Sequence, residues 1–236
     1  MIAAIPIYIL VPSGAFCLGS LWAVLRSPGP KLNSAVQHLA AGLIFAAVAV
    51  ELLPQEKGKS PLMVVVGFAV GTLFMLLLEV LVERVRSNDK GDRESLSFVA
   101  VVGVDITIDG LLIGLAFTLG SKQGVLVTSA LAVEFLSLGL TSTAAIAERL
   151  PGNRRRLALA AGLALLPVAG ALVGVQAFAG FSPGWISFVT AFAIAALMFL
   201  VTEELLREAH KLVNTHYAAA MFFIGFLVIF VIDLVA

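Results

Sequence analysis

The sequence predicts an all-α membrane protein with eight transmembrane helices in a 3+2+3 inverted-repeat arrangement. Of its 236 residues, 60% are hydrophobic and 13% are charged, which is more apolar surface than a soluble domain of this length can cover. The apolar residues form eight stretches, each about 20 residues long, which is the length that crosses the hydrocarbon core of a bilayer. No connection between them is long enough to fold alone, so we expect a single transmembrane domain over residues 1–236.

The predicted spans are separated by short connections that carry turn residues, such as Ser182-Pro183-Gly184. We expect helices near residues 3–25, 33–53, 61–83, 96–119, 124–147, 157–178, 185–208 and 216–236. No basic residue precedes Arg26, so we do not expect a cleaved signal peptide. The single cysteine, Cys17, excludes an intrachain disulfide and a cysteine-based metal cluster.

Basic residues are distributed unevenly among the predicted loops. With both termini outside, the inner loops hold twelve Lys and Arg residues, whereas the outer loops hold Lys57, Lys59 and Lys122. Loops rich in Lys and Arg remain in the cytoplasm during membrane insertion. We therefore expect an integral protein of a bacterial inner (plasma) membrane with both termini on the non-cytoplasmic side.

Two short internal repeats indicate the inverted arrangement. Glu51-Leu52-Leu53 ends the second span on the outer side, and Glu204-Leu205-Leu206 ends the seventh span on the inner side. The fourth and fifth spans share a template in which valine and an acid precede Gly-Leu. We expect outer triplets at 1–83 and 157–236 around a central helix pair at 96–147, an arrangement that suits alternating access in transporters.

The central pair of spans carries three acids near mid-membrane depth. Asp105 and Asp109 are four residues apart, which places both on one helix face, and Glu134 lies near the middle of the next span. Ser137 and Thr141 continue the polar face of Glu134 at helical spacing. Each buried carboxylate costs roughly 2.5–3.5 kcal/mol on insertion, and no Lys or Arg lies inside a span core to pair with it. The five side chains therefore predict a site for a cation, with oxygen ligands that suit divalent metals.

Other ionisable residues are weaker candidates for this site. We expect Glu51, Glu203 and Glu204 to be interfacial because they stand at span ends. We nevertheless keep Glu51 and His38 as lower-ranked candidate metal ligands. His38 lies one turn inside the second span. A helix-end histidine with a local hydrogen bond is the alternative for His38, and we expect His210 to be solvated.

The motifs of the central spans resemble those of the zinc/iron permease family of metal transporters. D-I-T-I-D-G stands where the family has H-N-x-P-E-G, and E-F-L-S-L-G stands where it has H-E-x-P-E-G. Asp105 and Glu134 thus take the two histidine positions, and Asp109 takes a glutamate position. Leu138 replaces the second glutamate, and Leu166 replaces an acid before the proline of the sixth span.

The resemblance extends to E-L-L-P-Q at residues 51–55, which is similar to the family's H-L-L-P-E. It implies eight spans in a 3+2+3 inverted repeat, both termini outside and a metal site on the fourth and fifth spans. Because two of the family's acids are replaced by leucine, it implies one surviving metal position built from Asp105, Asp109 and Glu134.

We expect this chain to transport a divalent metal ion as its substrate, with zinc, manganese and iron(II) as candidates. A carboxylate site without imidazole predicts weak discrimination in favour of zinc. A proton- or monovalent-cation-coupled carrier for another solute and a membrane-embedded metal-dependent enzyme are the alternatives. We do not expect this chain to be an enzyme, because neither a nucleophile nor a phosphate-binding basic cluster accompanies the acids. The expected partners are the lipid bilayer and the transported ion, and we expect no nucleic-acid partner. The sequence leaves open whether the chain forms a homodimer.

Overall fold

The computed structural model describes the chain except residues 1–4, 27–28, 89–92, 150–151, 213–215 and 236. Within the described residues every regular element is a helix, and eight helical stretches are long and apolar enough to cross a membrane. This confirms the predicted fold class. The observed ends differ from the predicted ones by a few residues, since the fifth span begins at Ser121 and the sixth at Asn153.

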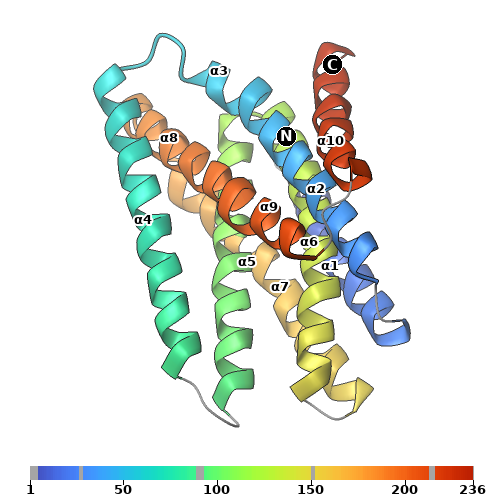
Figure 1. Cartoon of the computed structure of the whole chain (residues 1–236). Coiled ribbons are helices and arrows are strands. Elements are labelled where there is room, and N and C mark those ends of the chain that lie inside the picture. Colours follow the sequence, from blue (N-terminus) through green and yellow to red (C-terminus); the bar gives the residue numbers. More distant parts are fainter. Residues whose placement is uncertain (1–4, 27–28, 89–92, 150–151, 213–215, 236) are drawn as a thin grey trace.

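The elements follow one another with short connections (Figure 1). They are α1 (Ile5–Leu25), α2 (Pro30–Ala47), the π-helix η1 (Val48–Leu52), α3 (Leu53–Gln55), α4 (Pro61–Asn88), α5 (Arg93–Leu119), α6 (Ser121–Arg149), α7 (Asn153–Phe178), α8 (Pro183–Phe199), the π-helix η2 (Leu200–Leu205), α9 (Leu206–Leu212) and α10 (His216–Val235). Because α2, η1 and α3 are continuous, they form one span, as do α8, η2 and α9.

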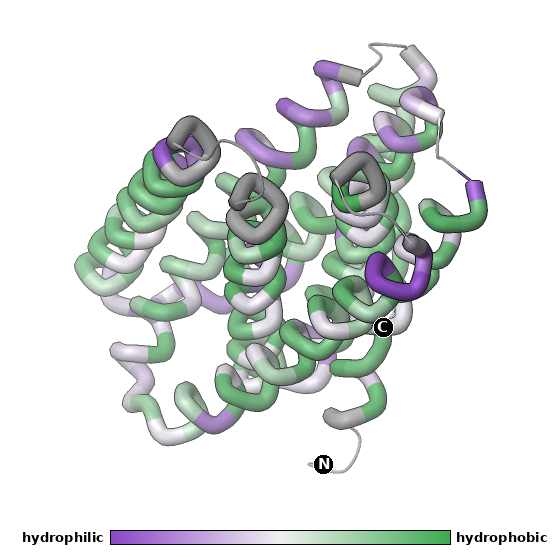
Figure 2. Tube along the Cα trace, turned by 90° about the horizontal axis from the view of Figure 1, so that it is seen from below, coloured by the Kyte–Doolittle hydropathy of each residue, from purple (hydrophilic) through white to green (hydrophobic). Residues whose placement is uncertain are grey.

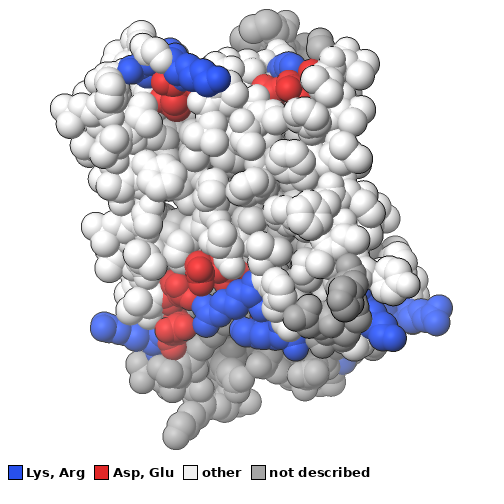
Figure 3. Space-filling view, turned by 45° about the horizontal axis from the view of Figure 1, so that its top comes forward, with Lys and Arg blue, Asp and Glu red and all other residues white. Residues whose placement is uncertain are grey.

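The surface has the pattern of a membrane protein. In the view of Figure 3, charged side chains gather in two bands at opposite ends of the bundle, and an uncharged zone separates them. Figure 2 shows that hydrophobic residues dominate the helices. The uncharged zone is where the hydrocarbon core surrounds the protein, because lipid cannot solvate charge. An even number of spans brings both termini to one side of the bilayer.

The main helix pairings follow the predicted inverted repeat. Helix α1 packs against α6, and α7 packs against α5; likewise α2 packs against α10, and α8 packs against α4. The repeat relates the first three spans to the last three, and α5 to α6. Under this exchange the α1–α6 pairing becomes the α7–α5 pairing, and the α2–α10 pairing becomes the α8–α4 pairing. Helices α5 and α6 also pack against each other and stand in the middle of the bundle (Figure 1). The assignment of the whole chain to one domain stays a prediction.

Glycines bring the central helices close to their neighbours. A Cβ atom added at Gly110 of α5 would overlap the backbone of Pro167 in α7, and one added at Gly139 of α6 would overlap the carbonyl group of Phe16 in α1. Small residues allow helices to approach this closely in a membrane, where packing replaces the hydrophobic effect as the cause of association. These contacts determine how α5 and α6 are rotated, and hence where their acids point.

The second and seventh spans each contain a π-helical segment that the sequence pattern did not predict. Segment η1 includes Glu51, and segment η2 includes Glu203 and Glu204. Each segment contains the first two residues of one copy of the E-L-L repeat, one at each end of the bundle. Single π-turns inside α-helices frequently occur at functional sites.

Candidate metal centre

Three carboxylates from α5 and α6 meet in the middle of the bundle. Asp105 and Asp109 come from α5 and Glu134 comes from α6, and each offers an oxygen within 4.8 Å of the other two. Asp109 and Glu134 are each 3% exposed, whereas Asp105 is half-buried. The convergence expected from their depth and helical spacing is therefore present.

Two oxygens in this cluster lack a conventional partner. Oδ2 of Asp109 and Oε2 of Glu134 are buried and accept no hydrogen bond from the described part of the protein. A buried polar atom without a partner is costly, so such atoms in a native structure need an explanation. A cation bound among the carboxylates would satisfy both oxygens at once. The donor set consists of oxygens alone, which suits hard and borderline divalent ions.

A cavity of about 680 Å³ connects the acids to one end of the bundle. Asp105 and Glu134 lie on its wall, and so do Ser137 and Thr141, which the sequence placed on the same helix face. The Thr141 hydroxyl donates a hydrogen bond to the Ser137 carbonyl at 3.0 Å, so its oxygen keeps lone pairs. The cavity gives an ion a water-sized path from this end to the carboxylates.

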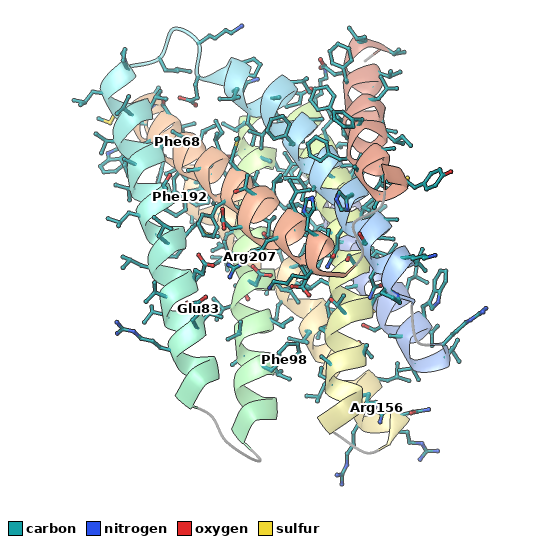
Figure 4. The ribbon with its side chains drawn as sticks, in the orientation of Figure 1. Phe68, Glu83, Phe98, Arg156, Phe192 and Arg207 are labelled. Carbon is teal, nitrogen blue, oxygen red and sulfur yellow. The ribbon has the colours of Figure 1, made fainter. Side chains whose placement is uncertain are left out.

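The mouth of the cavity is predominantly acidic. It is bordered by labelled residues of three helices, Glu83 of α4, Phe98 of α5 and Arg207 of α9 (Figure 4). Arg207 binds Glu79 at 2.5 Å, and Lys211 binds Glu208 at 3.4 Å. The lining acids outnumber these two bases: Glu79, Glu83, Glu203, Glu204 and Glu208. An acidic entrance raises the local concentration of cations.

Glu51 lies at the opposite end and belongs to a separate polar cluster. Its carboxylate is 3.4 Å from Nζ of Lys122 and accepts a hydrogen bond from Nε2 of Gln123 at 3.0 Å. The Lys122 ammonium also binds Asp233 of α10 at 2.8 Å. Lys122 and Glu134 are twelve positions apart along α6, which corresponds to about 18 Å. Glu51 therefore stands at a span end, as expected, but it is buried because Lys122 neutralises it.

His38 does not belong to the group of three acids whose oxygens converge. Its ring is 3% exposed and lies 5.1 Å from the ring of His210 on α9, measured between centroids. The Nδ1 atom donates to the Ser34 carbonyl at 2.8 Å, which is the local hydrogen bond considered for a helix-end histidine. Sequence reasoning did not pair the two histidines, because 171 residues of chain separate them and no local spacing relates them.

The leucines that replace two family acids are part of the apolar packing. Leu138 lines the cavity, and both Leu138 and Leu166 pack against the hydrophobic core. Neither can supply an oxygen for a second ion. The geometry thus agrees with a single cluster of carboxylates.

Comparison with known proteins supports the resemblance seen in the motifs. Over 223 residues the chain is 28% identical to an Arabidopsis thaliana protein named "Putative zinc transporter". The chain resembles the zinc/iron permease family. The alignment covers 89% of this chain but 35% of the relative, so the chain spans about a third of the relative's length. No protein-family model matches it.

Proposed function

We propose that this chain transports a divalent metal cation through a site formed by Asp105, Asp109 and Glu134, with Ser137 and Thr141 beside them. The observation that carries the proposal is the approach of three mostly buried carboxylates to within 4.8 Å. Two ionised carboxylates at that distance repel each other by about 3.5 kcal/mol at an effective dielectric constant of 20. A divalent ion between them replaces this repulsion by attraction.

The cavity and the polar cluster at the other end support transport by alternating access. The cavity reaches the carboxylates from one end, while Glu51, Lys122 and Asp233 are joined by ion pairs at the opposite end. From the distribution of basic residues we propose that the cavity opens to the cytoplasm and that the ion-paired cluster closes the outer side.

The inverted repeat suggests how the opposite state is built. Glu204 lines the open cavity, and its repeat counterpart Glu51 lies in the closed end. In the outward-open state, Glu51 would line the outer cavity as Glu204 lines the inner one. Release of Glu51 from Lys122 is then part of the opening step. Each glutamate is the next-to-last residue of its π-helical segment, which supports their equivalence in the repeat.

The relative named as a zinc transporter supports a metal as the substrate and transport as the activity. The ligands favour a broader choice of ion, because carboxylates and hydroxyls accept manganese and iron(II) about as well as zinc. We therefore propose zinc, manganese and iron(II) as substrates, with weaker zinc preference than a site with imidazole ligands would have.

Uptake into proteoliposomes tests this function. Vesicles with purified protein and an enclosed metal-sensitive dye should take up Mn²⁺ or Zn²⁺, and the Asp109→Ala variant should not. Glu56→Gln, which removes an acid from the connection after α3, is the matched control and should transport normally. Asp105→His should shift the preference toward zinc. Uptake by Asp109→Ala at the unmodified rate would exclude the site.

A further inference from the structure

Two histidines from separate helices lie side by side in the bundle. His38 lies on α2 and His210 on α9, and these two elements pack against each other. Their ring centroids are 5.1 Å apart, with an angle of 66° between the ring planes. Two imidazoles that share a tetrahedral zinc ion at 2.0–2.1 Å have ring centres about 5 Å apart. The observed separation therefore matches a shared ion.

Hydrogen bonds determine which ring nitrogens are available. Nδ1 of His38 contacts the Ser34 carbonyl at 2.8 Å, and Nδ1 of His210 contacts the Leu206 carbonyl at 2.5 Å. A carbonyl oxygen only accepts, so each Nδ1 must carry the proton and each neutral ring keeps its lone pair on Nε2. Metal-binding histidines characteristically donate their second ring N–H to a carbonyl or carboxylate in this way, which fixes both tautomer and orientation.

The surroundings allow an ion to reach the pair. His38 is buried, but His210 is exposed, so water can complete the coordination. Their chain neighbours, Gln37 and Lys211, line the wall of the cavity. Ser34 donates a hydrogen bond to the Ala209 carbonyl at 3.0 Å, and this contact holds α2 and α9 together beside the two rings.

We propose that His38 and His210 form a second metal site, distinct from the carboxylate cluster, that binds an imidazole-preferring ion of the zinc or copper class. Imidazole ligands suit zinc and copper, whereas carboxylates and hydroxyls suit harder ions. The two sites thus differ in chemistry as well as position. The second site does not depend on the transport function, since it requires only these two side chains.

Spectroscopy of bound Cu²⁺ in the full-length purified chain tests the second site. Electron spin-echo modulation detects the remote nitrogen of a coordinated imidazole, a signal that a carboxylate site cannot produce. The experiment uses a background variant in which Asp105, Asp109 and Glu134 are replaced by Asn, Asn and Gln. One equivalent of Cu²⁺ should show modulation from two imidazoles in both the unmodified chain and this background.

Each histidine is then replaced in turn. His210→Gln, at an exposed position, should lose the two-imidazole pattern, and so should His38→Gln. His216→Gln is the matched control and should keep it. Zinc should displace the bound copper. In the acid-free background the chain should bind one zinc ion, and it should bind none when His210→Gln is added. Modulation that is absent from the unmodified chain, or unchanged in both His38→Gln and His210→Gln, would overturn the proposal.

Discussion

Replacing Asp109 with asparagine should stabilise the metal-free protein while weakening its response to metal. One oxygen of each acid lies within 4.8 Å of the other two, and at 4.8 Å two ionised carboxylates repel by about 3.5 kcal/mol. Asp109 takes part in two such pairs, with Asp105 and Glu134. We expect a gain of about 1 kcal/mol, which is smaller than the full repulsion of one ionised pair. For a chain of this length that gain raises the melting temperature by about 2–4 °C.

Metal should stabilise the unmodified protein more than the Asp109→Asn variant. An ion at 100 times its dissociation constant stabilises the native protein by about 2.7 kcal/mol. The variant has lost one charged ligand, so the same concentration should stabilise it far less. Thermal unfolding followed by the fluorescence of Trp22 and Trp185, in detergent with EDTA or with Mn²⁺, measures both effects. Glu56→Gln, outside the cluster, should change neither.

The result that refutes this reasoning is specific. If Asp109→Asn melts at the unmodified temperature without metal and gains as much from Mn²⁺ as the unmodified chain, the carboxylates neither repel one another nor share an ion. If Asp109→Asn loses the metal response but is not stabilised, only the argument from carboxylate repulsion is refuted, because Asp109 would then have been uncharged before the substitution.

Three further predictions concern the site, its closed end and the helix packing. Affinity for Mn²⁺ should fall as the pH is lowered from 7.5 to 5.5, because protons compete for the carboxylate oxygens; calorimetric titration with a flat profile would contradict this. Lys122→Met should leave Glu51 without its cation and open the outer end of the bundle. A cysteine introduced at position 137 in a Cys17→Ser background should then react about tenfold faster with a thiol reagent added from outside. Equal reaction rates with and without Lys122→Met would show that the ion pairs do not close this end. Gly110→Val should lower stability by about 1–3 kcal/mol or more, because its side chain meets the Pro167 backbone, while Gly162→Val, with open space around it, should be tolerated; similar melting temperatures for the two variants would exclude close α5–α7 packing.

The number of spans and their approximate limits could be predicted because a bilayer imposes a length on every helix that crosses it. The pairing of Asp105 with Asp109 was equally accessible, since positions four apart share a face of any α-helix. Their cost in lipid explains why they were recognised as functional before any tertiary contact was known. The repeat of E-L-L also indicated the inversion that the helix pairings follow.

The rotation of one helix against another was decided only in the tertiary structure. A span that is apolar on nearly every side carries no pattern that states which face meets a neighbour, and here the glycine contacts of α5 and α6 determine it. Lys122 could be assigned to a loop from the sequence. Its ion pairs with Glu51 and Asp233 could not be predicted, because they also depend on how the helices pack. His38 and His210 are brought together by the packing of α2 on α9, which no local sequence pattern encodes. Sequence alone determines what each helix can contribute in the membrane, while the arrangement of distant side chains depends on contacts between helices that local patterns do not encode.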